Sequence, residues 1–286
     1  MTIRTVHHVT ELQAELAEWR ARRESIALVP TMGNLHAGHL SLVQRAHQLG
    51  ECVVVSVFVN PLQFGPGEDF ERYPRTLEAD AALLRQAGAH VLFAPAVADM
   101  YPGGYPPLTT VRVGGSLTDI LDGHFRPGHF DGVATVVNIL FNLVRPDVAV
   151  FGEKDWQQLQ VIRRMVADLG MAVRVVGVPT ARDADGLALS SRNQYLGAAE
   201  RALAPRLYAA LQAVAAGIEA GRRDFEVLCL EQKRALEAEG FRPQYLEVRS
   251  QDLSPARAEA TAFVALVAAY LGGTRLIDNL SLRLVS

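Results

Sequence analysis

The sequence predicts an α/β fold: a doubly wound parallel sheet with a second, smaller α+β domain at the C-terminal end. Two observations predict the sheet. Short apolar runs alternate with helical patterns over the first two thirds of the chain, and these runs lack polar alternation, as expected for strands covered by helices on both faces. A third observation predicts the second domain. Beyond about residue 180 the chain becomes rich in Ala, Leu and Glu and then strand-like.

The first domain is expected to contain five strands with helices between them. The predicted strands are residues 25–30, 51–60, 91–94, 147–151 and 173–178. The predicted helices are residues 40–49, 77–87, 132–144 and 156–169. Ligands of such sheets bind beyond the carboxyl ends of the strands, so the functional site is expected there.

The second domain is expected to contain two helices and three strands. Its predicted elements are helices 200–220 and 225–239 and strands 244–249, 261–269 and 275–282. The sequence RDADG at residues 182–186 has the composition of a hinge, so we place the domains at residues 1–182 and 183–286. The stretch YPGGYPP, residues 101–107, predicts an irregular loop.

Composition excludes several classes of partner. With 28 Lys and Arg against 31 Asp and Glu among 286 residues, the net charge of −3 argues against nucleic acid and anionic membranes. The first residues lack the apolar core of a signal peptide, and no apolar run is long enough to span a bilayer. Cys52 and Cys229 have no metal-ligand spacing and are assigned to packing. A cytoplasmic protein is therefore expected.

The stretch PTMGNLHAGH, residues 30–39, joins a predicted strand to a predicted helix. The first N–H groups of a helix lack partners within it, and the helix dipole adds positive charge, so such a junction favours phosphate. Gly33 and Gly38 would let the backbone approach a ligand closely, and His36 and His39 are spaced to reach one group. The pattern predicts a triphosphate site, but two histidines that only cap the helix would also fit it. A zinc pair is disfavoured because no third ligand lies nearby.

The stretch FGEKDWQQLQVI, residues 151–162, forms a second junction of this kind. Gly152 makes the turn, and Lys154 and Asp155 open the next helix. A lysine placed there suits a phosphate, while the acid could bind a ribose hydroxyl or only favour the helix N-terminus. The alternative is that these polar side chains are simply exposed to solvent and cap the helix.

A third polar segment is LSSRN, residues 189–193. Ser190 and Ser191 offer hydroxyl donors and Arg192 offers a fixed fork of N–H groups, all suited to phosphoryl oxygens. An ordinary loop or helix cap has the same composition.

Two further candidates lie after the second predicted strand. Asn60 and Gln63, in NPLQF, are neutral amides that could orient a small polar substrate, or form a plain turn before proline. Asp80 lies on the next helix, where a water-mediated magnesium contact and ordinary surface charge are both open. The glycine-rich stretch GHFRPGHFDGV, residues 123–133, predicts a mobile loop that would suit a lid over phosphates.

Together these segments resemble the pantothenate synthetase (pantoate–beta-alanine ligase) family. PTMGNLHAGH resembles the HIGH signature of the nucleotidyltransferase superfamily. The resemblance runs from about residue 25 to residue 196 and rests on five motifs in order: PTMGNLHAGH, VSVFVNPLQFGPGEDFERYPRT, GHFRPGHFDGV, VRPDVAVFGEKDWQQL and GLALSSRNQYL. It implies a Rossmann-like domain with a small C-terminal lid domain, usually in a homodimer. It also implies ATP- and Mg²⁺-dependent joining of pantoate to beta-alanine through a pantoyl adenylate, with release of AMP and pyrophosphate.

The resemblance also implies roles for individual residues. Gln63 and Gln158 would hold pantoate, with Asn60 and Gln63 near beta-alanine, and His39 matches the family's proposed proton donor. The implied ATP site consists of Met32, Gly33, Asn34, Leu35, His36, Ala37, Gly38, His39, Gly152, Glu153, Lys154, Asp155, Ala181, Leu189, Ser190, Ser191 and Arg192.

The chemistry of adenylation selects the catalytic candidates within that set. A carboxylate is already anionic at neutral pH, so its attack on phosphorus needs alignment and positive charge rather than a base. We therefore expect His36, His39, Lys154 and Arg192 to be catalytic, with Asp80 as a candidate Mg²⁺ contact.

Two other functions stay open at this stage. A nucleotidylyltransferase of the same superfamily would need a phosphate-bearing acceptor and more basic residues than NPLQF provides. A protein that senses ATP without chemistry would release no pyrophosphate.

Overall fold

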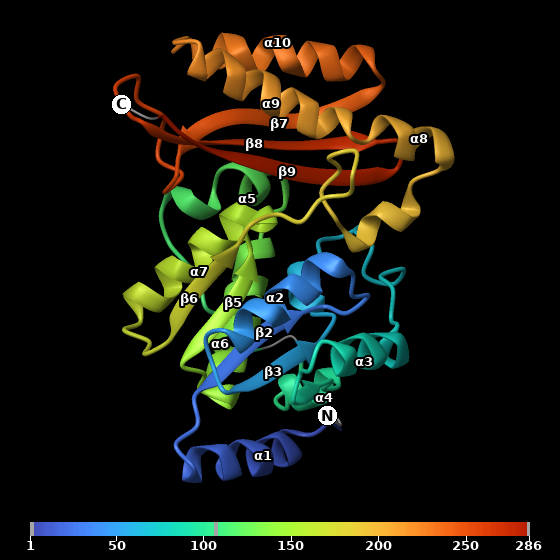
Figure 1. The fold of residues 1–286 in the computed structure, drawn as a ribbon, viewed down its shortest axis with the longest axis vertical. Coiled ribbons are helices and arrows are strands. Elements are labelled where there is room, and N and C mark those ends of the chain that lie inside the picture. The colour runs from blue at the N-terminus through green and yellow to red at the C-terminus, as the bar shows by residue number, and fades with distance from the viewer. Residues whose placement is uncertain (1–2, 106–107, 285–286) are drawn as a thin grey trace. The chain divides into compact units, whose positions relative to one another are not determined.

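The computed structural model describes residues 3–105 and 108–284 and has the predicted α/β architecture. The chain forms two compact units (Figure 1). The first contains the described chain up to Glu153 together with Val161–Pro179, and the second contains Lys154–Gln160 and the described chain from Thr180 onward. The boundary therefore passes through the segment that begins with Lys154.

The first unit is built on a six-stranded parallel sheet with the order β1-β4-β3-β2-β5-β6. Every pair of neighbouring strands is parallel. The strands are β1 (Arg4–Val6), β2 (Ile26–Thr31), β3 (Cys52–Val57), β4 (Val91–Phe93), β5 (Val148–Gly152) and β6 (Arg174–Val178). Because the central strands are apolar on both faces, both faces must be covered.

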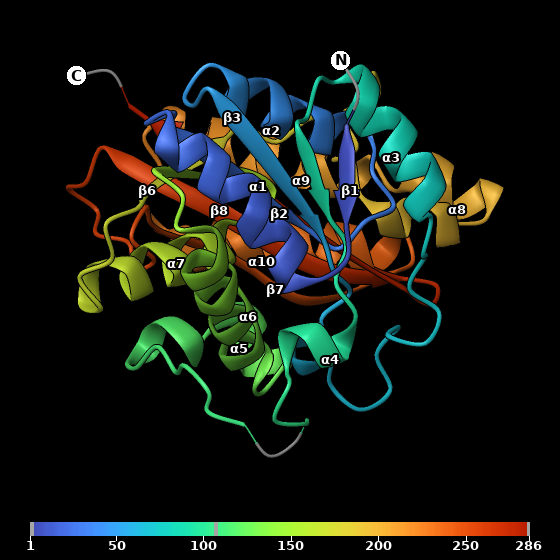
Figure 2. The ribbon, with the colours of Figure 1, turned by 90° about the horizontal axis from the view of Figure 1, so that it is seen from below.

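Helices cover the two faces of this sheet (Figure 2). On one face, α2 (Ala37–His47) and α3 (Leu77–Gln86) bury Leu42, Val43 and Leu84 against the strands. The longest helix, α6 (His129–Val144), contacts β2 and packs against α1 (Val9–Ala21). The shorter helices of the unit are α4 (Val97–Met100), α5 (Leu121–Phe125), η1 (Pro61–Gln63) and η2 (Ser116–Thr118).

The order of the strands places the predicted motifs at one edge of the sheet. The chain runs outward from β2 through β3 to β4 and then returns to β5 on the other side of β2. The topological switch point therefore lies between β2 and β5, where doubly wound sheets bind ligands. The glycine turn at residues 32–36 follows β2, Asn60 and Gln63 follow β3, and Gly152 ends β5.

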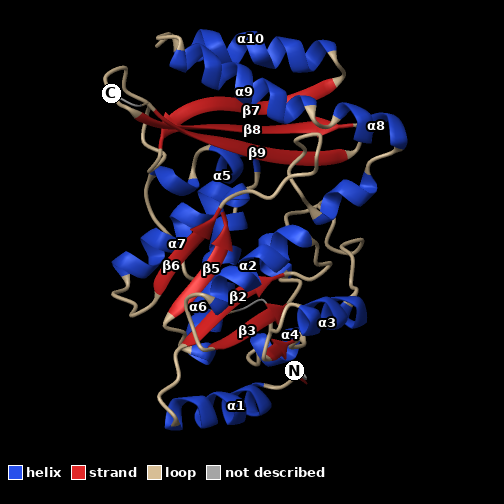
Figure 3. Ribbon diagram, viewed as in Figure 1, coloured by secondary structure: helices blue, strands red, loops and turns tan. Residues whose placement is uncertain are grey.

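The second unit contains an antiparallel sheet with the order β7-β8-β9, drawn in red in Figure 3. Its strands are β7 (Phe241–Ser250), β8 (Ala262–Leu271) and β9 (Thr274–Arg283). Helices α9 (Arg206–Glu219) and α10 (Phe225–Ala238) lie against the sheet and share its buried core. The remaining helical segments are η3 (Glu153–Asp155), α7 (Trp156–Asp168), which crosses the boundary, η4 (Ser191–Tyr195) and α8 (Ala198–Leu203).

Several predicted boundaries need correction. The single helix expected over residues 200–220 is two helices, α8 and α9, which are interrupted at Pro205. The stretch expected to be a loop at 123–133 is partly helical, because α5 extends to Phe125 and α6 begins at His129. Residues 101–105 lie outside regular elements after α4, whereas residues 106–107 of the same predicted loop lie outside the described residues.

Cys52 and Cys229 are both buried free thiols, in agreement with their assignment to packing. Burial raises the pKa of each thiol to about 12. Within residues 3–105 and 108–284, no helix combines the length and the apolarity needed to cross a membrane.

Candidate active site

The turn after β2 has a backbone that only particular residues can adopt. Gly33 has φ of +83° and Asn34 has φ of +50°, so two left-handed residues follow each other. A Cβ on Gly33 would lie 2.9 Å from Cγ1 of Val57 and 3.0 Å from Oδ2 of Asp80. Glycine at 33 is therefore required both by its φ angle and by the space around it.

Asp80 holds this turn from α3. Its carboxylate is only 1% exposed and accepts hydrogen bonds from the backbone N–H groups of Asn34 at 2.9 Å and Leu35 at 2.8 Å. Its Oδ2 also accepts from the hydroxyl of Thr76 at 3.2 Å. The two N–H groups thus point at an internal anion, and Asp80 has a positioning role. The magnesium contact that we expected of Asp80 stays a prediction.

His36 and His39 lie together at the start of α2. His36 is the N-cap residue, and its backbone N–H donates to Nδ1 of His39 at 3.3 Å. The two rings are 4.0 Å apart between centroids. Because Nδ1 of His39 accepts a proton donor, its neutral ring carries the proton on Nε2. The His39 ring thus accepts the N–H of the N-cap residue, and its own proton lies on Nε2.

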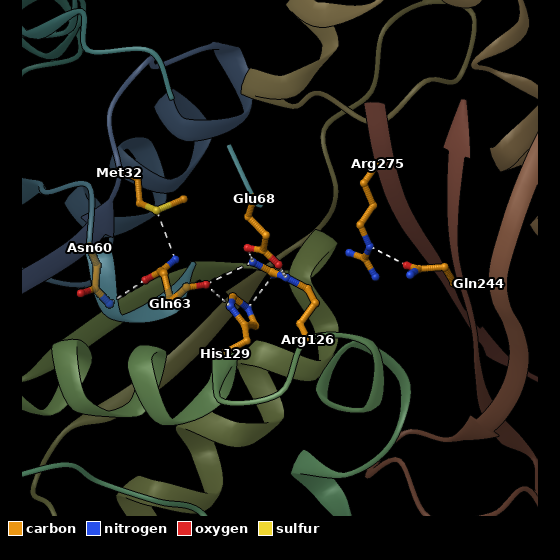
Figure 4. Close-up of polar contacts among 8 residues, drawn as sticks. All are labelled: Met32, Asn60, Gln63, Glu68, Arg126, His129, Gln244 and Arg275. Carbon is orange, nitrogen blue, oxygen red and sulfur yellow. Dashed lines mark hydrogen bonds and ion pairs between the residues drawn. The ribbon is translucent and has the colours of Figure 1, made fainter. Parts of the chain in front are cut away.

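Asn60, the N-cap residue of η1, and Gln63, its last residue, form a buried amide pair (Figure 4). The side chain of Asn60 donates to Oε1 of Gln63 at 3.0 Å and to the carbonyl of Gly132 at 3.1 Å. Its Oδ1 accepts from the hydroxyl of Tyr101 at 2.6 Å and from the N–H of Leu62 at 3.2 Å. All four hydrogen-bonding positions of the Asn60 amide are thus used within the protein. This pattern fits a residue that fixes Gln63 better than one that contacts a substrate.

The amide of Gln63 retains hydrogen-bonding capacity. Its Nε2 donates to Sδ of Met32 at 3.1 Å, and its Oε1 accepts from Asn60 (Figure 4). Among contacts of the described residues, these use one N–H and one lone pair, which leaves one donor and one acceptor. Gln63 thus connects two of the predicted motifs, the glycine turn after β2 and the NPLQF segment after β3.

Lys154 belongs to the second unit, where strand β9 fixes its backbone. The side chain of Asn279 donates to the carbonyl of Lys154 at 2.8 Å. Two residues on, the indole of Trp156 donates to the carbonyl of Gln251 at 3.0 Å. The Lys154 ammonium is 3.9 Å from a carboxylate oxygen of Asp155, which is 44% exposed, so this ion pair is weak. Gln158 lies half-buried in the same segment.

The chain from Ala181 to Leu189 forms a tight hairpin in the second unit. The N–H of Leu189 donates to the carbonyl of Ala181 at 2.9 Å, and a turn at Gly186 closes the hairpin. Arg182 makes a bidentate ion pair with the buried Asp278 at 2.6 and 2.9 Å. Burial raises the pKa of Asp278, while Arg182 opposes that effect. Beyond the hairpin, Ser190 accepts the N–H of Arg192 and so caps η4.

Consecutive residues of β9 thus serve two of the predicted ATP segments, since Asp278 holds the hairpin and Asn279 holds Lys154. Sequence reasoning did not find either residue. It also missed Tyr101 and Glu68 in the first unit, and it assigned Arg126 and His129 to a mobile lid over phosphates rather than to contacts with Gln63. Across the described ranges there is no cluster of three or more His, Cys, Asp or Glu side chains that could hold a metal.

Comparison with known proteins identifies the family of this chain. The family model for pantoate-beta-alanine ligase matches residues 4–281. A pantothenate synthetase of Pseudomonas fluorescens is 56% identical over 281 residues, which cover 98% of each chain. The chain belongs to the pantoate-beta-alanine ligase family.

Solved structures of pantoate-beta-alanine ligases have the same fold. The crystal structure of pantothenate synthetase from Thermus thermophilus superposes with a TM-score of 0.91 at 52% identity, covering 97% of this chain and 99% of that one. The ligase from Francisella tularensis, described as complexed with beta-gamma ATP and beta-alanine, has a TM-score of 0.82 at 31% identity, with 97% of each chain covered. The predicted Rossmann-like fold and family resemblance are thus confirmed.

Proposed function

We propose that this protein is a pantoate–beta-alanine ligase that joins (R)-pantoate to beta-alanine through a pantoyl adenylate, consuming ATP and releasing AMP and pyrophosphate. The observation that carries the proposal is similarity over the full length to the ligase family, including the relative described with bound beta-gamma ATP and beta-alanine. The amide of Gln63 at the carboxyl edge of the sheet supports it, because it offers one donor and one acceptor to a small polar acid.

We assign the ATP site to four segments. These are the turn and helix start from Met32 to His39, the strand end at residues 152–155, the backbone at Ala181, and residues 189–192. His39, with Nε2–H as a donor, and the N-terminus of α2 suit phosphate oxygens. Gln63 and Gln158 are assigned to pantoate. Asn60 supports Gln63, and beta-alanine would bind near both.

In the first step a carboxylate oxygen of pantoate attacks the α-phosphorus of ATP. A P–O bond to pyrophosphate breaks, and the pyrophosphate leaves with the electron pair. No base is required, because the carboxylate is ionised at neutral pH. The demand is for positive charge and N–H donors near the departing pyrophosphate. Lys154 and Arg192 would supply the charge, and His36 and His39 would supply N–H donors.

In the second step the unprotonated amine of beta-alanine attacks the acyl carbon of the adenylate. The amide bond forms, the acyl–phosphate bond breaks, and AMP leaves as its anion while the amine loses a proton. AMP is a good leaving group and needs little acid catalysis. A proton from His39 would therefore give only a modest acceleration.

Magnesium would enter with the nucleotide as part of the substrate MgATP. Mg²⁺ commonly keeps several waters and binds substrate phosphates with one or two carboxylates. The described residues offer no multi-carboxylate cage, and the Asp80 oxygens already accept three hydrogen bonds, so phosphate oxygens and water would provide most of its ligands.

The remaining proposals concern the whole molecule. We propose a homodimer in the cytoplasm, with residues 1–182 binding ATP and pantoate and residues 183–286 acting as a lid. Light scattering behind a sizing column would measure the mass of the assembly against the 31.1 kDa chain. Fractionation of the source cells would test the location.

Product analysis with ATP, pantoate and beta-alanine, each omitted in turn, tests the reaction. We expect equal amounts of AMP, pyrophosphate and pantothenate from the complete mixture. We also expect exchange of labelled pyrophosphate into ATP to require pantoate but not beta-alanine, because the adenylate forms first. Lys154→Ala and His39→Ala should slow this exchange more than they weaken ATP binding.

Other outcomes would identify the rival functions. Exchange without pantoate, but with a phosphate-bearing acceptor, would indicate a nucleotidylyltransferase. ATP binding without any pyrophosphate release would indicate a sensor. Near-normal exchange in the Lys154→Ala variant would remove that lysine from the chemistry.

A further inference from the structure

Two side chains near the start of α6 bind the backbone of Gln63 in the first unit (Figure 4). The ring Nδ1 of His129 lies 2.8 Å from the carbonyl oxygen of Gln63, and the Arg126 guanidinium donates to the same oxygen at 3.2 Å. A carbonyl can only accept, so Nδ1 of His129 must carry a proton. One carbonyl thus receives two donors from a different part of the chain.

The tautomer of His129 is fixed on the other side of the ring as well. A guanidinium N–H of Arg126 lies 3.0 Å from Nε2, and because arginine can only donate, Nε2 must accept. Burial lowers the pKa of His129 to about 4, and the charge on Arg126 acts in the same direction. The ring is therefore neutral near pH 7, with its single N–H directed at Gln63.

Glu68 holds Arg126 in this arrangement. Two guanidinium nitrogens donate to the two carboxylate oxygens at 2.7 and 2.6 Å, which is the strong bidentate geometry. The side chains are only 13% and 24% exposed. Burial alone would raise the pKa of Glu68, but Arg126 reverses this effect and keeps the pKa below its usual value. The acid is thus ionised at neutral pH and orients Arg126.

The backbone of α6 approaches η1 closely at the same place. A Cβ on Gly132 would lie 2.3 Å from the carbonyl oxygen of Leu62 and 2.7 Å from the N–H nitrogen of Gln63. Glycine at 132 therefore permits a contact that any larger residue would prevent. The carbonyl of Gly132 also receives Asn60. Side-chain and backbone contacts from α6 thus converge on the residue assigned to pantoate.

We propose that His129 and Arg126 are positioning residues for pantoate: by binding the Gln63 carbonyl they hold the η1 turn so that the Gln63 amide meets the substrate. The inference rests on the proposed function of Gln63. Neither residue needs to touch pantoate, and Glu68 acts one step further away. Loss of either donor would let the turn rotate and would weaken pantoate binding, while ATP binding would stay close to normal.

Paired substitutions of His129 test this proposal. The side-chain amide of asparagine can place an N–H near the position of Nδ1, whereas alanine cannot. Asn142→Ala serves as the control, since Asn142 is exposed on α6 and, among the described residues, its side chain bonds to Asn138 of its own helix alone. Pantoate-dependent pyrophosphate release is measured with pantoate and ATP varied separately, and circular dichroism melting verifies folding.

We expect His129→Ala to raise the KM for pantoate about 3- to 10-fold, the value of one hydrogen bond, and to change the KM for ATP by less than about twofold. His129→Asn should recover most of the loss, and Arg126→Gln should raise the pantoate KM without rescue. Equal effects on both substrates, no effect on either, or an Asn variant as impaired as the Ala variant would overturn the proposal. If His129→Ala does not fold, the comparison of His129→Asn with Arg126→Gln decides by the same criteria. A wild-type protein without pantoate-dependent activity would instead refute the proposed function.

Discussion

Asp80 allows a sharp test of how the turn after β2 is held. Its carboxylate, 1% exposed, accepts the N–H groups of Asn34 and Leu35, which lie 46 and 45 residues away in the sequence. Asp80→Ala removes both acceptors. Asp80→Asn keeps the shape but replaces one acceptor oxygen with an NH₂ group, which cannot accept from a backbone N–H.

The expected cost follows from these two contacts. A buried donor left without a partner costs about 1–3 kcal/mol, so Asp80→Ala should lose roughly 2–6 kcal/mol of unfolding free energy. For a domain of this size that corresponds to a fall in Tm of roughly 5–20 °C. Asp80→Asn should lose roughly half as much, since one N–H keeps an acceptor. Both variants should also raise the KM for ATP, because the turn with its two left-handed residues is no longer held.

Thermal melting and ATP kinetics at several Mg²⁺ concentrations measure these effects. Glu78→Gln is the matched control, since Glu78 is an exposed acid in the same helical turn and its loss should leave Tm and KM unchanged. An Asp80→Asn variant with wild-type stability and wild-type ATP kinetics would refute the positioning role. Unchanged stability together with a higher Mg²⁺ requirement would favour the magnesium contact instead.

Three further predictions concern Gly132, Asn279 and His129. Gly132→Ala should destabilise the protein by about 1–3 kcal/mol and raise the KM for pantoate, because the added Cβ would overlap the carbonyl of Leu62. Denaturant unfolding and pantoate kinetics measure the two effects, and wild-type values would contradict the close approach of α6 to η1. Asn279→Ala should raise the KM for ATP a few-fold and leave the KM for pantoate unchanged, since it removes the hydrogen bond to the carbonyl of Lys154. Parallel titrations of the two substrates measure both constants, and an equal rise in both would contradict this prediction. For His129, the folded pKa of about 4 lies below the ordinary 6.5, so the unfolded chain binds a proton first and stability falls as pH drops from 6.5 to 4, by up to roughly 3 kcal/mol. Urea unfolding at pH 7 and pH 4.5 should show a smaller loss in His129→Asn, and an identical loss would show that the histidine is not buried in neutral form.

Local sequence was sufficient to predict five of the six strands of the parallel sheet. Apolar runs such as residues 52–55 favour burial on both faces, so β2, β4, β5 and β6 were predicted to within one residue at each end, whereas the prediction for β3 ran three residues too far. Among the elements that were missed are β1, which has only three residues, α1, and the four-residue helix α4. In α1 the buried Leu12, Leu16 and Trp19 carry a helical spacing that could have been recognised.

The candidate site was predictable only where a motif carries its own geometry. The strand–glycine–helix junction at residues 30–39 can be recognised from the sequence, because Gly33 and the helix start are close together in the chain. The contacts that hold the candidate site residues in place cannot be recognised in this way. Asn279 lies 125 residues from Lys154, and Arg126 lies 58 residues from Glu68, so no periodicity or local propensity connects them. Such pairs follow from the tertiary fold alone.

The position of Asp80 changes how the glycine turn is expected to act on a nucleotide. A turn rich in glycine at a helix start commonly offers its N–H groups to phosphate. Here the N–H groups of Asn34 and Leu35 are already bound to a carboxylate. A phosphate bound at the start of α2 would therefore meet the negative charge of this carboxylate as well. We therefore expect the turn to contribute shape rather than charge. The positive charge that the departing pyrophosphate needs would then come from side chains and from the first turn of α2. Removing one such cation should consequently slow adenylation more than any change within the turn that preserves its shape.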